Sequence, residues 1–300
     1  MKHNKIVAVV VTYNRKEMLE ENLDALLSQT EDRYDILVID NHSTDGTDEL
    51  MKEYALLEDR IQYFDTGKNL GGAGGFAYGI RLAIEKGYSW LWLMDDDCMP
   101  KRNALEELTN TAKRLKGRFG FLSSKTMWKD GSLCRMNVQR TTLFENLTKY
   151  PSEKGEPIPI VIASFVSMFL PAKVVRRVGL PMAEFFIWTD DWEYSRRISR
   201  HFPCYAVPES EVVHETEENV GTSIATDEVE RLWRYRYAYR NEVVLYRREG
   251  LRGMLHLLAR TPLHMARVLL KAKDHRRERL SAILKGTWQG FWFFPKVERV

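Results

Sequence analysis

The chain has 300 residues, of which 44% are hydrophobic and 29% charged, enough for one large α/β domain or for a domain with a helical appendage. Its three cysteines (Cys98, Cys134 and Cys204) are far apart and odd in number, which disfavours a disulfide framework or a paired-cysteine metal site and fits a reducing compartment. The formal charge of +3 hides a division, because residues 1–230 carry a net −9 and residues 231–300 a net +12. A basic end of this kind predicts contact with something anionic, such as phospholipid, nucleic acid or another chain.

The N-terminal stretch MKHNKIVAVVVTYNRK is predicted to lead into a strand. Its apolar run is short and no small-residue cleavage site follows, so we do not expect a signal peptide. No stretch of the sequence approaches the roughly 18 to 20 apolar residues that a membrane-spanning helix needs.

Strand and helix patterns alternate through the first hundred residues. Strands are predicted at 5–12, 35–40, 61–64 and 89–94, and helices at 16–28, from 44 to 54, and from a glycine-rich loop to about residue 86. This repetition predicts a doubly wound, mostly parallel sheet of the Rossmann-like kind. Ligands of such sheets bind at the carboxyl ends of the strands, where Thr12, Asp40 and Asp95 lie.

The second half of the chain has a less regular pattern. We expect a helix at 103–115, a strand at 120–124, loop and hairpin at 129–155, an apolar strand at 161–171, a loop at 180–184, a helix at 190–201 and a short strand at 205–207. From residue 227 the chain is predicted to be helical, with a helix at 229–248 and then two or three basic amphipathic helices broken near Gly250 and Pro262. The expected division is a catalytic domain at 1–226, with halves at about 1–100 and 101–226, and a helical region at 227–300.

Three consecutive aspartates, Asp95, Asp96 and Asp97, follow the fourth predicted strand. Adjacent carboxylates repel one another unless a cation neutralises them. The outer two can point the same way across a turn, and their hard oxygens suit Mg²⁺ or Mn²⁺. A capped, solvated turn explains the aspartates about equally well on this pattern alone.

The loop NLGGAGGF at 69–76 opens the third predicted helix. It lacks the lysine of a P-loop and does not follow the first strand, which disfavours a Rossmann dinucleotide site. Glycines let a backbone approach a ligand or another strand closely, and a tight strand-to-helix turn is the simpler interpretation. Four glycines in five residues exceed what a turn requires, so we favour a ligand-facing loop.

A second acidic pair, Asp190 and Asp191, begins a predicted helix within FFIWTDDWEYSRR. Helix capping explains at most one of the two. The neighbouring aromatic residues should desolvate the pair and raise its pKa towards that of a general base. Trp188, Trp192 and Glu193 are the candidate contacts to an acceptor sugar. His214, a lone histidine among acidic residues, is predicted from local sequence to be structural.

Four segments, VVTYNRKEMLEENLDALLSQT, ILVIDNHSTDGT, NLGGAGGFAYGI and WLWLMDDDCMP, occur in the order seen in inverting glycosyltransferases of family 2, which have the GT-A fold. The resemblance spans residues 5 to 245. It implies a nucleotide-sugar donor bound across the strand ends and a divalent cation, Mn²⁺ or Mg²⁺.

The same resemblance assigns residues to roles. It implies that Asp191 is the catalytic base, with Asp190 completing the acidic pair, and that Asp95, Asp97 and His214 hold the metal ion. For His214 this reverses the local interpretation. The implied donor contacts are Thr12, Tyr13, Asn14 and Arg15 near the base and ribose, Asp40 at the uracil or thymine ring, Asn69 and Gly72 at the pyrophosphate, and Asp95 with Asp97 at the cation and ribose. Asp96, the middle aspartate, is a further candidate for the donor site without an assigned contact.

Within the family, the glycine loop, the triple aspartate, the tryptophan before the acidic pair and the following histidine resemble the galactofuranosyltransferase branch. Rhamnosyltransferases share much of this pattern. Thr189 departs from the branch, which more often has Trp next to Asp, and the chain lacks the added domains of large polymerising members. The resemblance therefore implies addition of one galactofuranose from UDP-galactofuranose to a hydroxyl of a lipid-linked glycan in bacterial cell-surface polysaccharide synthesis.

Three alternatives remain open at this stage. The first is a rhamnosyltransferase that uses dTDP-rhamnose, and the second is a nucleotide-sugar-binding protein without catalysis. The third, a nucleotidyltransferase, is disfavoured because the basic, glycine-rich start typical of those enzymes is missing.

The basic C-terminal region has Leu, Met and Val at helical spacing with Arg and Lys between them. A helical cap on the catalytic domain and an interfacial helix on an anionic membrane are about equally well supported. No nucleic-acid-binding motif accompanies the charge, so we expect no nucleic-acid partner. The aromatic segment WQGFWFF at 288–294 offers a surface for homo-oligomers. The expected location is cytoplasmic, peripheral on the inner face of the cell membrane.

Overall fold

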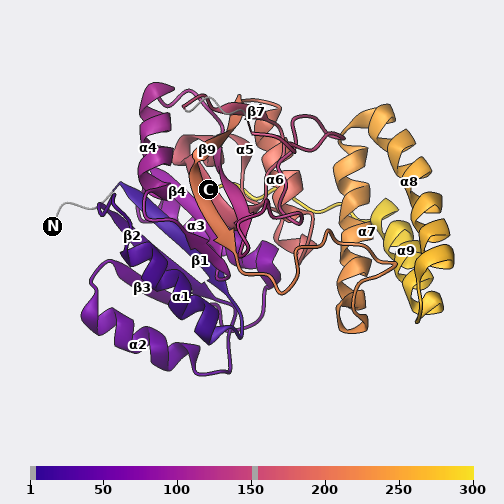
Figure 1. Ribbon diagram of the computed structural model, residues 1–300, viewed down its shortest axis with the longest axis horizontal. Helices are drawn as coiled ribbons and strands as arrows, with labels where there is room; N and C mark the ends of the chain where they lie inside the picture. The colour runs from indigo at the N-terminus through magenta and orange to yellow at the C-terminus, as the bar shows by residue number, and fades with distance from the viewer. Residues whose placement is uncertain (1–4, 151–154) are drawn as a thin grey trace.

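The first four strands form the parallel half of one sheet. In the computed structural model, which describes residues 5–150 and 155–300, these strands are β1 (Ile6–Thr12), β2 (Tyr34–Asp40), β3 (Ile61–Asp65) and β4 (Trp90–Asp95). They lie in the order β3-β2-β1-β4 with parallel pairing throughout. Helices α1 (Lys16–Leu27), α2 (Thr47–Leu57) and α3 (Gly71–Glu85) connect them, which confirms the doubly wound arrangement (Figure 1).

The second half of the chain extends the same sheet with mixed pairing. Beyond β4 the order is β8 (Met168–Pro171), β6 (Leu122–Trp128), β9 (Cys204–His214) and β5 (Cys98–Pro100), and β7 (Ile158–Ile160) pairs with β9. β8 is antiparallel to both of its neighbours, whereas β6 and β9 are parallel. Helices α4 (Ala104–Arg114), α5 (Ala172–Val178) and α6 (Asp190–Ser199) complete this half.

Both faces of the sheet are buried, which explains why the strand segments show little alternation of polar and apolar residues. On one face, Val7, Val9 and Val11 of β1 pack with α3, α5 and α6. On the other face, Ala8 and Val10 pack with α1 and α4. The result is a three-layer α/β/α sandwich.

Three sequence predictions in this half were wrong in extent. The strand expected at 120–124 is β6, which begins at Leu122 and continues to Trp128. Residues 161–171 were expected to form one strand, but only Met168–Pro171 is extended, after a 3₁₀ turn at Phe165–Ser167. The strand expected at 205–207 is longer and continues to His214. Residues 208–210 form a bulge within it, between Val207 and Glu211, which pair with consecutive residues of β6. This bulge accommodates Pro208, which cannot donate a ladder hydrogen bond. The predicted hairpin region at 129–155 includes residues 151–154, which lie outside the described residues.

Three C-terminal helices form a layer beside the sandwich: α7 (Leu232–Arg247), α8 (Gly250–Lys271) and α9 (Arg276–Phe291). Figure 1 shows α7 next to the sandwich and α8 on the outside. The expected break at Gly250 is confirmed, but Pro262 lies inside α8. Its missing N–H leaves the carbonyl of Leu258 without a helical donor, and both residues are exposed, so water can satisfy that carbonyl. Within the described residues, no helix is long and apolar enough to cross a membrane.

The last residues return to the sandwich, as the yellow trace in Figure 1 shows. The carbonyl of Phe293 accepts a hydrogen bond of 2.7 Å from Arg247, and the carbonyl of Glu298 accepts one of 2.8 Å from the backbone of Leu180. The carboxylate of Glu298 also pairs with Arg81 of α3. The C-terminal region is therefore fastened to the sandwich through its tail. A domain boundary at residue 226 stays a prediction.

Candidate active site

Register in the sheet brings three predicted site residues to one edge. Thr12 of β1 is paired with Asp40 of β2, and Val11 is paired with Asp95 of β4. Thr12, Asp40 and Asp95 therefore occupy adjacent strand ends, as the alternation of strands and helices predicted.

The side chains of Asp96 and Asp97 are held by residues from the end of β1 and by His214. The hydroxyl of Thr12 donates to Asp96 Oδ2 at 2.8 Å, and Arg15 Nη1 lies 3.2 Å from Asp96 Oδ1 and 2.5 Å from Asp97 Oδ2. Asp97 Oδ1 lies 3.1 Å from Nε2 of His214, the last residue of β9. Thr12 and Arg15, expected at the base and ribose, thus make their hydrogen bonds and ion pairs with the aspartates.

The electrostatics separate the three aspartates. Burial and the charge of Asp97 raise the pKa of Asp95 to about 7 and that of Asp96 to about 6. Although burial opposes it, contact with His214 and Arg15 holds the pKa of Asp97 well below its usual range. Burial also opposes the charged form of His214, yet contacts with Asp97 and Cys134 raise its pKa to about 10. The site therefore has less positive charge than its carboxylates require, a deficit that a divalent cation would remove.

The predicted metal ligands are only partly assembled. Among residues 5–150 and 155–300, no group of three or more His, Cys, Asp or Glu side chains is arranged to hold a metal ion. Two of the three predicted ligands do meet, at the 3.1 Å contact between Asp97 and His214. This contact is a hydrogen-bonded ion pair, so Nε2 of His214 would have to lose its proton before the imidazole could bind a cation. Asp95 is close enough to the other two for its pKa to respond to both charges. The donor types fit Mg²⁺ or Mn²⁺.

The predicted base-binding loop is an ordered turn. Asp40 is 1% exposed, and its carboxylate accepts hydrogen bonds from the backbone and hydroxyl of Ser43 and from the hydroxyl of Tyr63, at 2.6 to 2.9 Å. Asn14 accepts a bond of 2.7 Å from the backbone of Thr44, and Tyr13 is 43% exposed. The carboxylate of Asp40 therefore stabilises the turn, and Tyr13 is the exposed side chain next to this turn. Tyr63 had no distinguishing signal in the sequence.

The glycine loop mainly serves close packing. A Cβ on Gly75 would lie 2.6 Å from Val11 of β1, and one on Gly79 would lie 2.5 Å from Val9. A Cβ on Gly71 (φ +70°) would lie 2.2 Å from the carbonyl oxygen of Phe186. A Cβ on Gly72 would meet nothing within 4 Å, so this glycine faces open space. Most of this loop thus brings α3 close to β1 and to residue 186, and Gly72 keeps the predicted ligand-facing character. Beside it, Asn69 accepts the backbone N–H of Gly71 at 2.8 Å.

The acidic pair Asp190 and Asp191 begins α6, as predicted. Burial raises the pKa of Asp190 to about 7. Burial and the charges of Asp190 and Asp95 raise the pKa of Asp191 well above its ordinary value. The two acidic clusters, 94 positions apart in sequence at Asp191 and Asp97, therefore share one electrostatic site.

The three predicted acceptor contacts have different surroundings. The ring of Trp188 lies edge-on to Tyr235 at 4.9 Å, and the guanidinium of Arg140 lies 3.9 Å from the ring of Trp192. Both indoles are partly buried. Glu193 is 2% exposed and is bound by Arg197 and Arg248, each at 2.9 Å. The structure therefore puts Glu193 in a packed ion network, where its charge contributes to the raised pKa of Asp190 but its carboxylate is bound by the two arginines.

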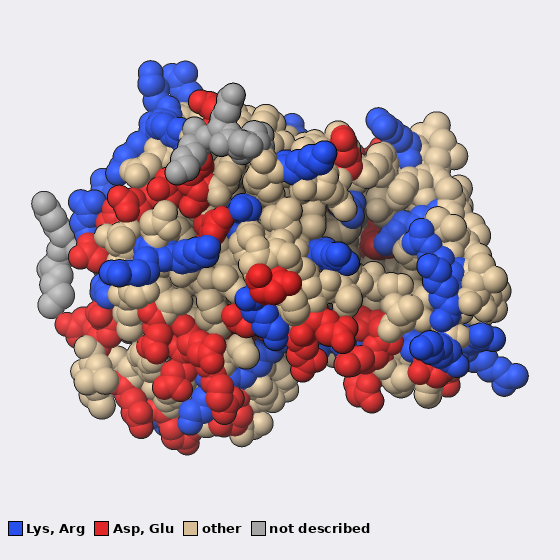
Figure 2. All heavy atoms as spheres, viewed as in Figure 1, with Lys and Arg blue, Asp and Glu red and all other residues tan. Residues whose placement is uncertain are grey.

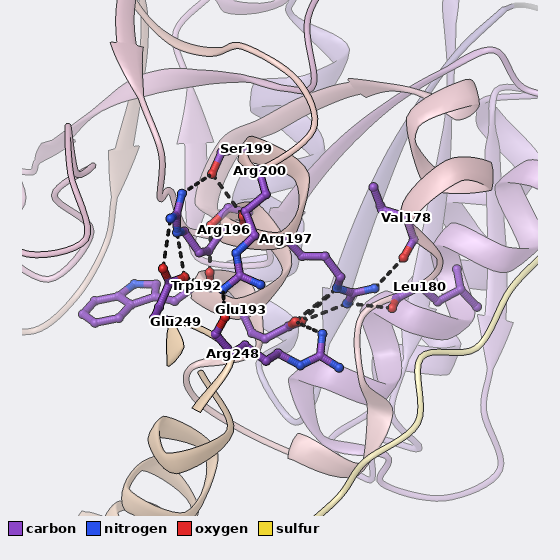
Figure 3. Close-up of polar contacts among 11 residues, drawn as sticks. Val178, Leu180, Trp192, Glu193, Arg196, Arg197, Ser199, Arg200, Arg248 and Glu249 are labelled. Carbon is purple, nitrogen blue, oxygen red and sulfur yellow. Dashed lines mark hydrogen bonds and ion pairs between the residues drawn. The ribbon is translucent and has the colours of Figure 1, made fainter. Parts of the chain in front are cut away.

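Figure 3 shows this network between α6 and the junction of α7 and α8. Arg197 also donates to the carbonyls of Val178 and Leu180, at 2.8 and 3.0 Å. Arg196 forms a two-pronged pair with Glu249, at 2.8 and 3.0 Å. The helix that begins with the acidic pair is thereby anchored to the C-terminal helices.

Comparisons with known proteins agree with this architecture. Residues 7–120 match the sequence model of glycosyl transferase family 2. Galactofuranosyltransferase GlfT1 of Mycolicibacterium smegmatis is 28% identical over 271 residues, which cover 85% of this chain and 87% of that protein. The resemblance to family 2 is thus confirmed for residues 7–120, and over most of its length the chain is similar to a galactofuranosyltransferase.

Solved structures share the fold. The mannosyltransferase PcManGT of Pyrobaculum calidifontis, in complex with GDP-Man and Mn²⁺, has a TM-score of 0.59 at 15% identity, covering 96% of this chain and 87% of that chain. GalNAc-T7 with UDP, GalNAc and Mn²⁺ has a TM-score of 0.64 at 17% identity, covering 82% of this chain but 48% of that chain. At these identities the likeness bears on the fold alone, and it confirms the GT-A expectation.

Proposed function

We propose that this chain, a glycosyltransferase by its likeness to family 2, inverts configuration as it transfers galactofuranose from UDP-galactofuranose to a hydroxyl of a glycan acceptor. The observation that carries the proposal is the electrostatic coupling of two acidic groups from different parts of the fold. Asp95 ends β4, Asp191 begins α6, and the charge of Asp95 raises the pKa of Asp191. A donor site and a base in one place are what sugar transfer requires.

On the donor side, the nucleotide would lie across the ends of β1, β2 and β4. Tyr13 and the turn held by Asp40 would border the base, and Gly72 would allow the diphosphate to approach the backbone of α3. Asn69 lies at the same turn. Asp95 would face the ribose, while Asp96, held by Thr12 and Arg15, supports the site from within.

On the acceptor side, Asp191 would remove the proton from the attacking hydroxyl. Its raised pKa makes its carboxylate a stronger base than an exposed aspartate. The hydroxyl oxygen would attack the anomeric carbon from the face opposite the diphosphate, so the configuration inverts. One base suffices for this route, whereas a retaining double displacement needs a carboxylate nucleophile as well.

Asp95, Asp97 and His214 would hold a divalent cation. When bound, Mn²⁺ or Mg²⁺ supplies positive charge that stabilises the diphosphate leaving group. The short supply of positive charge around the three aspartates supports this assignment, as does the contact that brings Asp97 and His214 together.

Donor turnover by the purified protein tests the proposal. With Mn²⁺ present, we expect release of UDP from UDP-galactofuranose and little release of dTDP from dTDP-rhamnose. The reverse result would replace the first donor with the second. Tight donor binding without turnover in the presence of any acceptor glycan would instead support a binding protein. The 28% identity to a galactofuranosyltransferase favours the first outcome.

The outer helices support a peripheral membrane location. On α8, Leu251, Leu255, Leu258 and Leu269 recur at helical spacing, and each is more than half exposed. Trp288 of α9 and Trp292, which directly follows that helix, are 66% and 71% exposed. Basic side chains gather over α8 and α9 in Figure 2, whereas acidic ones gather over α1 and α2. An exposed apolar stripe beside basic residues is the pattern of a helix that lies on an anionic bilayer, where a lipid-linked acceptor would be available.

A further inference from the structure

The loop that leads into the acidic pair has an unusual backbone. Three of its non-glycine residues have positive φ: Phe186 at 65°, Trp188 at 63° and Thr189 at 71°. With ψ at −62°, Phe186 is the centre of a classic γ-turn, closed by a bond of 2.8 Å from the N–H of Ile187 to the carbonyl of Phe185. Such conformations persist only where the surroundings enforce them. The sequence 185–189 should therefore relax to another shape without outside contacts.

Those contacts come chiefly from Asn241, near the middle of α7. Its side chain is fully buried, and Nδ2 lies 3.0 Å from the carbonyl oxygen of Phe185, 3.2 Å from that of Ile187 and 2.8 Å from that of Trp188. An amide nitrogen has two hydrogens, so the three carbonyls share them. Since all three partners are acceptors, the amide must present its nitrogen to the loop.

The orientation of this amide is fixed from its other end as well. Asn241 Oδ1 accepts a hydrogen bond of 3.0 Å from Nε of Arg240. Arg240 itself donates to the carbonyls of Glu184 and Phe185, at 2.7 and 3.0 Å. The first turn of α3 adds one more contact, from the N–H of Ala73 to the carbonyl of Phe186 at 3.1 Å. The carbonyls of Ile187 and Trp188 have Asn241 as their side-chain partner, so this residue holds the part of the loop nearest the acids.

The position of Asp191 depends on this loop. Trp188 and Thr189 both turn left-handed immediately before α6 begins at Asp190. A change at either residue would move Asp190 and Asp191, while the ion pair of Glu193 with Arg248, two residues after Asp191, and that of Arg196 with Glu249 hold the rest of the helix in place. A base displaced by about 1 Å can slow catalysis on the order of 100-fold.

We propose that Asn241 is a positioning residue for the reaction, because it holds the strained loop 185–189 in the one shape that directs Asp191 towards the donor site at Asp95. The inference rests on the proposed function, since it gives the acidic pair its catalytic role. It also makes α7 part of the catalytic unit.

The test compares Asn241→Ala with Val243→Ala. Val243 is on the same helix and fully buried, and it packs against Gly290 of α9 without a hydrogen bond to the loop. Two readouts are needed: hydrogen exchange of a peptide covering 185–192, and kcat, KM and the pH profile of sugar transfer. Both are measured well below the unfolding temperature of each variant.

For Asn241→Ala we expect faster exchange in 185–192 with little change in β1 and β2. We expect kcat to fall on the order of 100-fold, with the donor KM and the affinity for UDP nearly unchanged. The pH midpoint of kcat should also move, because the surroundings of Asp191 change. Asn241→Ser, which keeps one donor, should lie between Asn241→Ala and the wild type. Val243→Ala should be less stable, with normal exchange in the loop and kcat within about twofold of the wild type.

Equal exchange and equal kcat in the Asn241→Ala and Val243→Ala variants would overturn the proposal and leave Asn241 as an ordinary packing residue. Failure of the proposed function would be seen differently, because the wild type would then release no nucleoside diphosphate from any sugar donor. The comparison of hydrogen exchange between the two variants does not require enzymatic turnover. It therefore shows whether Asn241 holds the loop even if the proposed function is wrong.

Discussion

The hydrogen bond from Thr12 to Asp96 predicts a stability loss that depends on pH. Thr12 and Asp96 are 1% and 3% exposed, so water cannot replace the hydroxyl in Thr12→Val, a substitution of nearly equal volume. A hydrogen bond to a buried carboxylate is worth about 2 kcal/mol, which corresponds to a rise of roughly 1.5 pKa units. Burial and the charge of Asp97 already raise the pKa of Asp96 to about 6.

The direction of the pH effect follows from this raised value. A carboxyl that holds its proton more tightly in the folded chain lowers stability as pH rises from the unfolded to the folded pKa. Thr12→Val should raise the folded pKa of Asp96 further, so the pH range over which stability falls extends to higher pH. Near pH 5 Asp96 is mostly protonated in both proteins, and the charge-dependent loss is close to zero. Near pH 8 it should reach about 2 kcal/mol.

Urea unfolding in EDTA, at about pH 5 and about pH 8, measures the loss. Thr47→Val is the matched control, because buried Thr47 donates to Asp45 at 2.6 Å. Although burial opposes it, this bond holds the pKa of Asp45 below its ordinary value, so Asp45 stays ionised throughout the range. The control should lose the same free energy at both pH values. A pH-independent loss in Thr12→Val as well would refute the reasoning about Asp96.

Three further predictions concern catalysis and membrane contact. Asp191→Asn should lower kcat by about 10²- to 10⁴-fold while UDP binding remains. Wild-type kcat should rise with pH above the range in which an ordinary aspartate ionises, because the pKa of Asp191 is raised; a flat profile would contradict its role as base. EDTA should abolish transfer and Mn²⁺ should restore it, whereas full activity in EDTA would exclude the metal site at Asp97 and His214. The double substitution Leu255→Asp and Leu258→Asp should abolish sedimentation of the protein with phosphatidylglycerol vesicles, while activity on a soluble acceptor stays unchanged. If the variant still sediments with the vesicles, or if it loses the ability to dimerise instead, α8 does not face lipid.

The sheet and the strand-end residues could be predicted from sequence because their signals are local. Runs such as 5–12 and 89–94 are apolar without alternation, which indicates strands buried on both faces. Once alternating helices make these strands parallel, their carboxyl ends must share an edge, so Thr12, Asp40 and Asp95 had to be neighbours.

Contacts between distant segments could not be predicted in the same way. Arg15 and Asp97 are 82 positions apart, and Asp97 and His214 are 117 apart, so no periodicity links them. The family resemblance supplied His214, but nothing indicated that Arg15 would neutralise Asp96 and Asp97. Glu193 was chosen for its place next to the acidic pair, and its burial against Arg248 depends on a helix more than 50 positions away. The helix break predicted at Pro262 was wrong for a related reason. Whether α8 can contain a proline depends on which face of the helix is exposed to water, and the sequence alone does not show this.

The hold of Asn241 on residues 185–189 also implies an order of assembly. Asn241 follows Trp188 by 53 positions, so a growing chain completes the sheet and α6 before α7 exists. Domains fold as their residues emerge, and contacts of high sequence separation form late. We therefore expect nucleotide binding to be acquired before catalysis during synthesis. An incomplete chain could therefore bind a nucleotide-sugar donor without being able to transfer the sugar.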